Sequence, residues 1–150
     1  MSKELQLIKL IEDLYVLLNK HKKMLSKLIS KKEYYSKEIN NLLEDHYCEI
    51  DDIIDLIEYN FGMVKVLDFH MVELDHNNMK TLISVAFKIN KSVFQFCKNM
   101  YPLILNIDRK EHNNKLLYHY ITTCKNSKQG FFLKFNQLWA DLYKILNLFK

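Results

Sequence analysis

The scarcity of glycine and proline constrains this chain more than any other feature of its sequence. Among 150 residues there are two glycines, Gly62 and Gly130, and one proline, Pro102. Sandwiches and doubly wound sheets need many tight turns, and those turns are built around such residues. Almost half of the residues are apolar, which is enough to build a core without disulfides. The sequence therefore predicts an all-α fold in which residues 1–150 form a single-domain bundle of six or seven helices.

The clearest periodic segment covers residues 3–29. Apolar side chains and one histidine recur there every seven residues, at Leu7, Leu14, His21 and Leu28. This spacing predicts a long N-terminal amphipathic helix whose stripe forms a bundle seam or a coiled coil, including a possible homodimer. At such a position we interpret His21 as a hydrogen-bonded core or dimer-seam residue rather than a ligand.

The first helix is expected to break near Ser30. A helix running from residue 3 to 45 would be about 64 Å long, far more than a globule of this size would span. Ser30 and Glu33 have the spacing of a capping box, which would start a second helix there.

Shorter periodic segments indicate the remaining helices. Pro102 is expected to end the longest of them, and Asp108 with Glu111 forms a second capping-box spacing. We expect these helices at 50–57 with an end at Asn60-Phe61-Gly62, at 63–75, at 79–100, from Asp108 to about Cys124, and at 131–149.

Charge is distributed unevenly along the chain. Residues 39–75 contain ten acidic side chains and one lysine, whereas residues 20–38 and 76–150 are strongly basic. Such segments can neutralise one another inside a fold, or they can leave an acidic or basic face for a partner. Arg109 is the only arginine, which disfavours base-specific recognition of nucleic acid, although lysine suffices for contacts with phosphate.

No residue pattern predicts a cofactor, a metal or an enzyme. Cys48, Cys97 and Cys124 are widely spaced and are interpreted as small buried hydrophobic residues in a reducing compartment. Glu73 and His76 have the spacing of one half of a di-iron motif, but no second copy exists. Glycine is too scarce for a phosphate-binding loop or an oxyanion loop. We therefore expect neither catalytic residues nor bound metal.

By elimination, the sequence favours a protein–protein interaction module: an adaptor, an inhibitor or a secretion-type chaperone. The preferred contact rim is the acidic set Asp51, Asp52, Asp55 and Glu58, next to an apolar groove. The alternative is a nucleic-acid-binding protein with a lysine-rich face at Lys22, Lys27 and Lys31. A helical enzyme or metalloprotein is the second alternative. We also expect no leader peptide, no membrane span and a cytoplasmic location.

Overall fold

The computed structural model describes residues 3–61, 76–126 and 131–147, and in these residues it confirms the all-α prediction. They contain α1 (Lys3–Ile29), the short 3-10 helix η1 (Lys32–Tyr34), α2 (Lys37–Phe61), α3 (His76–Ile104), α4 (His112–Asn126) and α5 (Phe131–Asn147), with no strand among them. The described part of the chain thus has five α-helices rather than six or seven. The helix expected at residues 63–75 lies outside the described residues.

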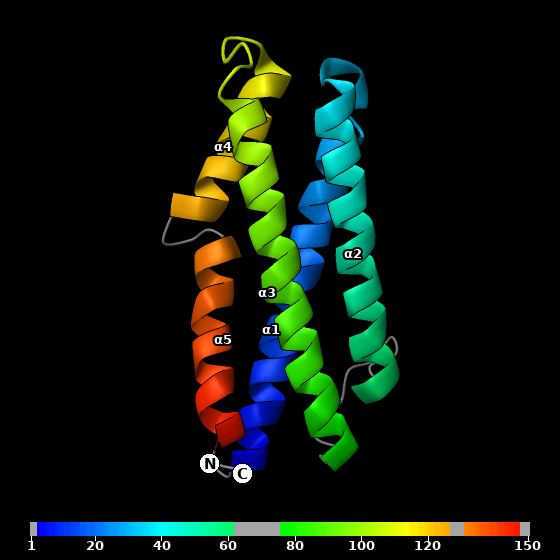
Figure 1. The fold of residues 1–150 in the computed structure, drawn as a ribbon, viewed down its shortest axis with the longest axis vertical. Coiled ribbons are helices and arrows are strands. Elements are labelled where there is room, and N and C mark those ends of the chain that lie inside the picture. Colours follow the sequence, from blue (N-terminus) through cyan, green and yellow to red (C-terminus); the bar gives the residue numbers. More distant parts are fainter. Residues whose placement is uncertain (1–2, 62–75, 127–130, 148–150) are drawn as a thin grey trace.

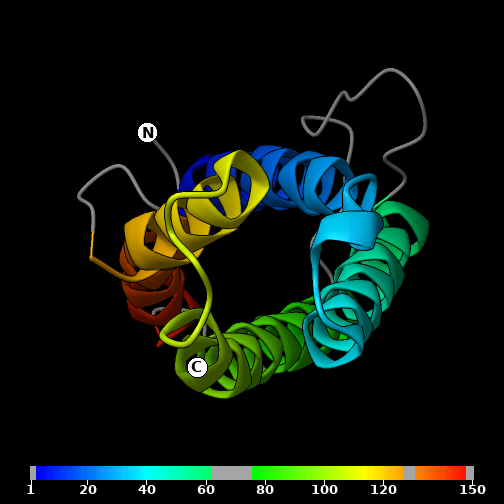
Figure 2. The same cartoon turned by 90° about the horizontal axis from the view of Figure 1, so that it is seen from above.

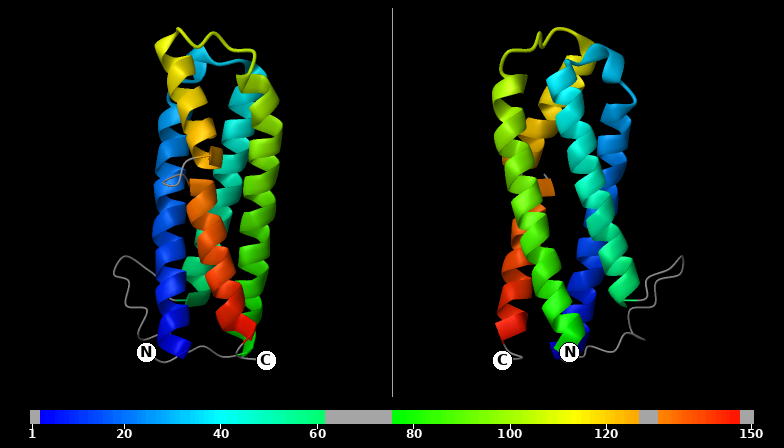
Figure 3. Two further views of the ribbon diagram at one scale, coloured as in Figure 1. Left: turned by 90° about the vertical axis from the view of Figure 1, so that its left-hand side faces the viewer. Right: turned by 45° about the vertical axis from the view of Figure 1, so that its right-hand side comes forward.

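Helices α1, α2 and α3 stand side by side and alternate in direction along the chain (Figure 1). Seen from above, α1, α2 and α3 occupy three corners of a four-cornered bundle, and α4 together with α5 occupies the fourth (Figure 2). Figure 3 shows that α4 and α5 follow one another end to end, so that both run back towards the end where α1 begins. Neighbouring positions are in contact throughout, because α1 packs on α2 and α5, and α3 packs on α2 and α4.

The seven-residue stripe of α1 faces the core of this bundle. Leu7, Leu14, His21 and Leu28 are all buried, as the periodicity predicts. Helix α1 packs on α2 and α5, and His21 also contacts Phe96 of α3 and Tyr120 of α4, so the stripe is buried within one chain. The buried apolar set is Leu7, Ile8, Ile11, Leu14, Leu18, Leu25, Leu28, Tyr35, Ile39, Leu43, Ile50, Ile53, Ile54, Ile57, Phe61, Leu82, Val85, Ala86, Ile89, Val93, Phe96, Met100, Ile104, Leu117, Ile121 and Leu142.

The break near Ser30 is confirmed, but the next helix starts later than expected. Ser30 does not cap an α-helix, because its hydroxyl donates to the Lys27 carbonyl at the end of α1. The chain turns through η1, and the Ser36 hydroxyl accepts the Ile39 amide at the start of α2. Ser36 is therefore the residue that caps α2.

Helix α2 is continuous where the sequence analysis expected two helices. Ile39, Leu43, His46 and Ile50 are buried at spacings of four, three and four residues, so the inward face passes through the polar cluster near residue 45 without interruption. His46 belongs to this inward face although it follows the charged residues Glu44 and Asp45.

Two further helix boundaries differ from the expectation. Pro102 does not end α3 but lies inside its last turn. There a proline removes one backbone donor close to the helix end, and the buried Ile104 still packs into the core. At the next helix, Glu111 acts as the cap by accepting the Asn114 amide, so α4 starts at His112 rather than at Asp108. Asp108 instead accepts the Lys110 amide in the preceding turn.

Among the helices that the structure describes, none has the length and apolar character needed to cross a membrane.

Candidate partner-binding surface and buried histidine chain

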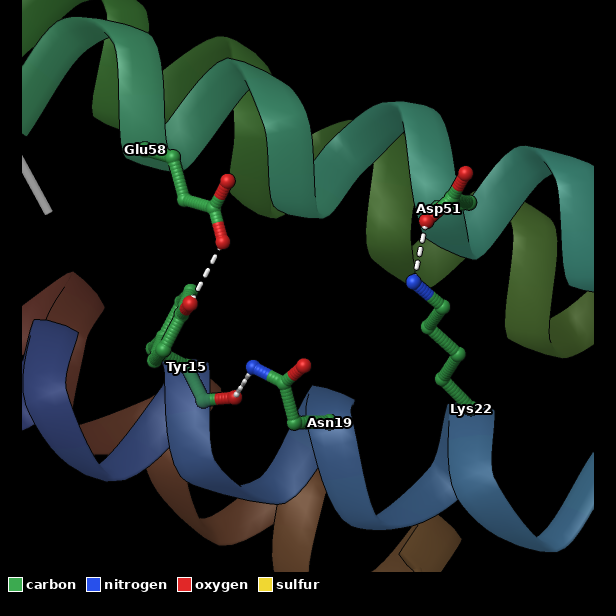
Figure 4. A network of polar contacts seen from close by, with 5 residues as sticks. All are labelled: Tyr15, Asn19, Lys22, Asp51 and Glu58. Carbon is green, nitrogen blue, oxygen red and sulfur yellow. Dashed lines mark hydrogen bonds and ion pairs between the residues drawn. The ribbon is translucent and has the colours of Figure 1, made fainter. Parts of the chain in front are cut away.

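The residues predicted as an acidic rim fall on two sides of α2. The Asp51 carboxylate lies 2.5 Å from the Lys22 ammonium of α1, and the Glu58 carboxylate accepts the Tyr15 hydroxyl at 2.5 Å (Figure 4). The hydrogen bond with Asp51 is the main cause of a raised pKa for Lys22. Asp52 and Asp55, by contrast, are exposed. The structure therefore brings Asp51 and Glu58 onto α1 and leaves the other two facing solvent.

The same ion pair involves one of the three lysines of the predicted basic face. Lys22 is neutralised by Asp51, whereas Lys27 is exposed and Lys31 half-buried at the end of α1. Part of the charge asymmetry of the sequence is thus neutralised within the fold, between α1 and α2.

A groove of about 420 Å³ lies between α2 and α3. Its acidic residues come from α2 and its lysines from α3, with apolar and amide side chains between them. The lining residues are Glu49, Asp52, Ile53 and Leu56 on α2 and Lys88, Lys91, Ser92 and Gln95 on α3. This groove adjoins part of the predicted rim, since Asp52 belongs to both, but its walls carry charges of both signs.

Helix α3 also carries an apolar stripe on its outer surface, which we call the α3 stripe: Ile83, Phe87 and Phe94. These side chains are 47%, 65% and 54% exposed, although the core residues of the same helix are almost completely buried. Their spacing of four and seven residues places them within about 40° of one another around the helix. Large apolar side chains clustered in this way mark an interaction surface more often than isolated ones do.

A chain of polar side chains crosses the core and joins four helices. The Tyr120 hydroxyl of α4 contacts Nδ1 of His21 on α1, and Nε2 of His21 lies 2.8 Å from Nε2 of His46 on α2. Nδ1 of His46 lies 3.1 Å from the Ser92 hydroxyl of α3, which in turn is 2.5 Å from the Glu49 carboxylate. The outer end of this chain, at Ser92 and Glu49, opens into the groove between α2 and α3.

The donor and the acceptor of each hydrogen bond in this series of side chains can be assigned by starting from the carboxylate of Glu49. An ionised carboxylate only accepts, so Ser92 donates its proton to Glu49 and accepts from Nδ1–H of His46. His46 then offers a lone pair at Nε2 to Nε2–H of His21, and Nδ1 of His21 accepts from Tyr120. Every link is satisfied with both histidines neutral.

Burial lowers the pKa of both histidines. Desolvation brings the pKa of His46 to about 3, and desolvation together with the proximity of His46 keeps the pKa of His21 well below its usual value. The His46 ring is also stacked on Phe96, with 4.0 Å between ring centroids. Ser92, His46 and His21 have the order of a nucleophile, a base and an orienting group. However, such a weakly basic His46 is poorly suited to remove a proton at neutral pH.

For metal binding, the described part of the chain contains no cluster of three or more potential ligands from histidine, cysteine, aspartate and glutamate. Glu73, one member of the predicted half-motif with His76, lies outside the described residues. The expectation that the cysteines are buried is wrong for Cys48, which lies on the exposed side of α2; Cys97 is half-buried, and neither of the two forms a disulfide.

The sequence identified one member of the buried chain. His21 is the hydrogen-bonded core histidine that its heptad position predicts. His46, Ser92 and Tyr120 were missed, because they lie on three other helices and have no common spacing. The only available signal was that His46 continues the apolar period of α2.

Comparison with known proteins gives no relative for this arrangement: no protein-family model, no characterised protein and no solved structure matches the chain.

Proposed function

We propose that this protein is a protein–protein interaction module that binds its partner through the outer face of α3. The observation that carries this proposal is the α3 stripe, in which Phe87 and Phe94 leave more than half of their surface in water. Aromatic side chains are enriched at binding hot spots, where a few residues supply most of the binding energy.

The predicted acidic rim contributes less to this proposal than the sequence suggested. Asp51 and Glu58 are engaged with α1, so only Asp52 and Asp55 remain exposed to act on a partner. Exposed charges of this kind mainly influence the rate of association, whereas buried apolar contacts determine how long a complex lasts.

A photocrosslinking experiment tests the proposal. A benzophenone amino acid at position 94 should give a discrete crosslinked product in an extract of the native host. The matched control is position 143 on α5, because Tyr143 is exposed to the same extent, 54%, as Phe94. The same product from both positions, or no product from position 94, would contradict the proposal.

A further inference from the structure

The charges around the α3 stripe define the kind of partner that fits it. Helix α3 contains four lysines and no acidic residue over its full length, His76–Ile104. At about 100° per residue, Lys80, Lys91 and Lys98 lie along one flank of the stripe. The opposite flank carries the uncharged Asn90 and Cys97. The stripe is therefore apolar in its middle and basic along one side.

The neighbouring α2 has the opposite charge. Glu49 and Asp52 stand on the far wall of the groove, and Asp55 is exposed further around α2. An acidic ligand is attracted by the lysines of α3 and repelled by the carboxylates of α2. These two effects together favour a position on the α3 stripe rather than in the groove.

From this arrangement we infer that the α3 stripe docks an amphipathic helix whose apolar face is bordered by acidic residues. This inference rests on the proposed function and assigns the chemical class of its partner. The stripe from Ile83 to Phe94 is about 17 Å long, which corresponds to three turns of a helix lying along α3. A helix in this position presents apolar residues every three or four positions to the stripe and carboxylates to Lys91 and Lys98.

Binding of synthetic helical peptides provides a direct test. The first peptide has four turns with leucine at every third or fourth position and glutamate beside that face. Two control peptides have the same length: one replaces each glutamate by lysine, and the other replaces each leucine by serine. Fluorescence anisotropy should show saturable binding of the first peptide. Each control peptide should bind at least about tenfold more weakly. Equal binding of the glutamate and lysine peptides would overturn the inference.

Variants of the full chain locate the binding site. Phe87→Ser with Phe94→Ser should weaken binding of the acidic peptide about tenfold, and Tyr143→Ser should not change it. Lys91→Glu with Lys98→Glu should also weaken it and reduce its dependence on salt, whereas Lys27→Glu, remote on α1, should have little effect. All these sites are exposed, so the variants should fold, and a thermal melt checks this directly. Unchanged peptide binding in the double phenylalanine variant would overturn the inference.

The crosslinked product from position 94 separates this inference from the proposed function. Recovery of a partner segment with an apolar face and flanking carboxylates would support both. A partner without an acidic helical segment, or a product containing two copies of this chain, would refute the acidic-helix inference and leave the interaction module standing. Binding of the chain to anionic lipid vesicles or duplex DNA in place of the acidic peptide would overturn the inference as well.

Discussion

The Nε2 atoms of His21 and His46 lie 2.8 Å apart in the core, and each ring uses its other nitrogen for a second hydrogen bond. One of the two facing nitrogens must carry a proton and the other must not. The accepting ring must therefore be neutral, and burial, which lowers the pKa of both histidines, favours the neutral form of the donor as well. Through Tyr120, His46 and Ser92 this contact links α1 to the three other positions of the bundle.

Acid should destabilise the protein because of this pair. The pKa of His46 is about 3 in the folded chain, and the pKa of His21 is also lowered, against 6.5 for an unburied histidine. Below pH 6.5 the unfolded chain therefore binds more protons than the folded one, and stability is lost as the pH falls towards the folded pKa values. Between pH 6.5 and 4.5 we expect His46 alone to account for a loss of about 2 kcal/mol, to which His21 adds in the same direction. Urea unfolding at several pH values measures this loss.

The control for this prediction separates the buried pair from other titrating groups. Replacing His21 and His46 together by glutamine should flatten the pH dependence between 6.5 and 4.5, whatever its effect on stability at pH 7. A wild-type profile that stays flat over this range would contradict the assignment of neutral histidines.

Removing the Ser92 hydroxyl from the buried hydrogen-bond chain should lower the stability of the protein more than removing an exposed hydroxyl from the same helix. Ser92→Ala leaves Nδ1–H of His46 without its acceptor, and an unsatisfied buried donor costs about 1–3 kcal/mol. Ser84→Ala, at an exposed serine of the same helix, should change stability by less than about 0.5 kcal/mol. Chemical denaturation compares the two, and equal costs would show that the Ser92–His46 bond contributes nothing.

The stripe of α1 should tolerate no charge. Leu14 is 3% exposed, so Leu14→Asp buries a carboxylate without a partner and should lower stability by several kcal/mol or prevent folding. Val16→Asp, two residues away at a position that is 44% exposed, is the matched control and should melt like the wild type. Circular dichroism melting would refute the packing of α1 if both variants behaved alike.

Nucleic acid should bind only weakly. We expect a dissociation constant no tighter than about 10 µM for duplex or single strands at physiological salt, near ordinary non-specific affinity. Lys22 is neutralised by Asp51, so reversal at Lys27 and Lys31 should matter more than reversal at Lys22. Anisotropy titration tests this expectation. Nanomolar affinity that persists at 150 mM salt would replace the protein-partner proposal by its rival.

The sequence by itself determined the all-α class, the course of α1 and the inward position of His21. These properties follow from local causes: too little glycine and proline for tight turns, and a seven-residue apolar period that has to be buried. Where a boundary depended on which side chain reached the nearest backbone amide, the expected caps, Ser30 and Asp108, were wrong, and Ser36 and Glu111 cap the helices instead.

Only the tertiary structure decided the relationships between helices. The sequence placed Asp51 in a rim for a protein partner and Lys22 in the alternative face for nucleic acid, yet they form an ion pair because α1 and α2 pack antiparallel with these positions at one level. Likewise, the exposure of Phe87 and Phe94 depends on which side of α3 its neighbours cover, and the apolar pattern of α3 alone does not specify that side. Contacts between residues far apart in the chain are set by packing and helix register, which a local period does not encode.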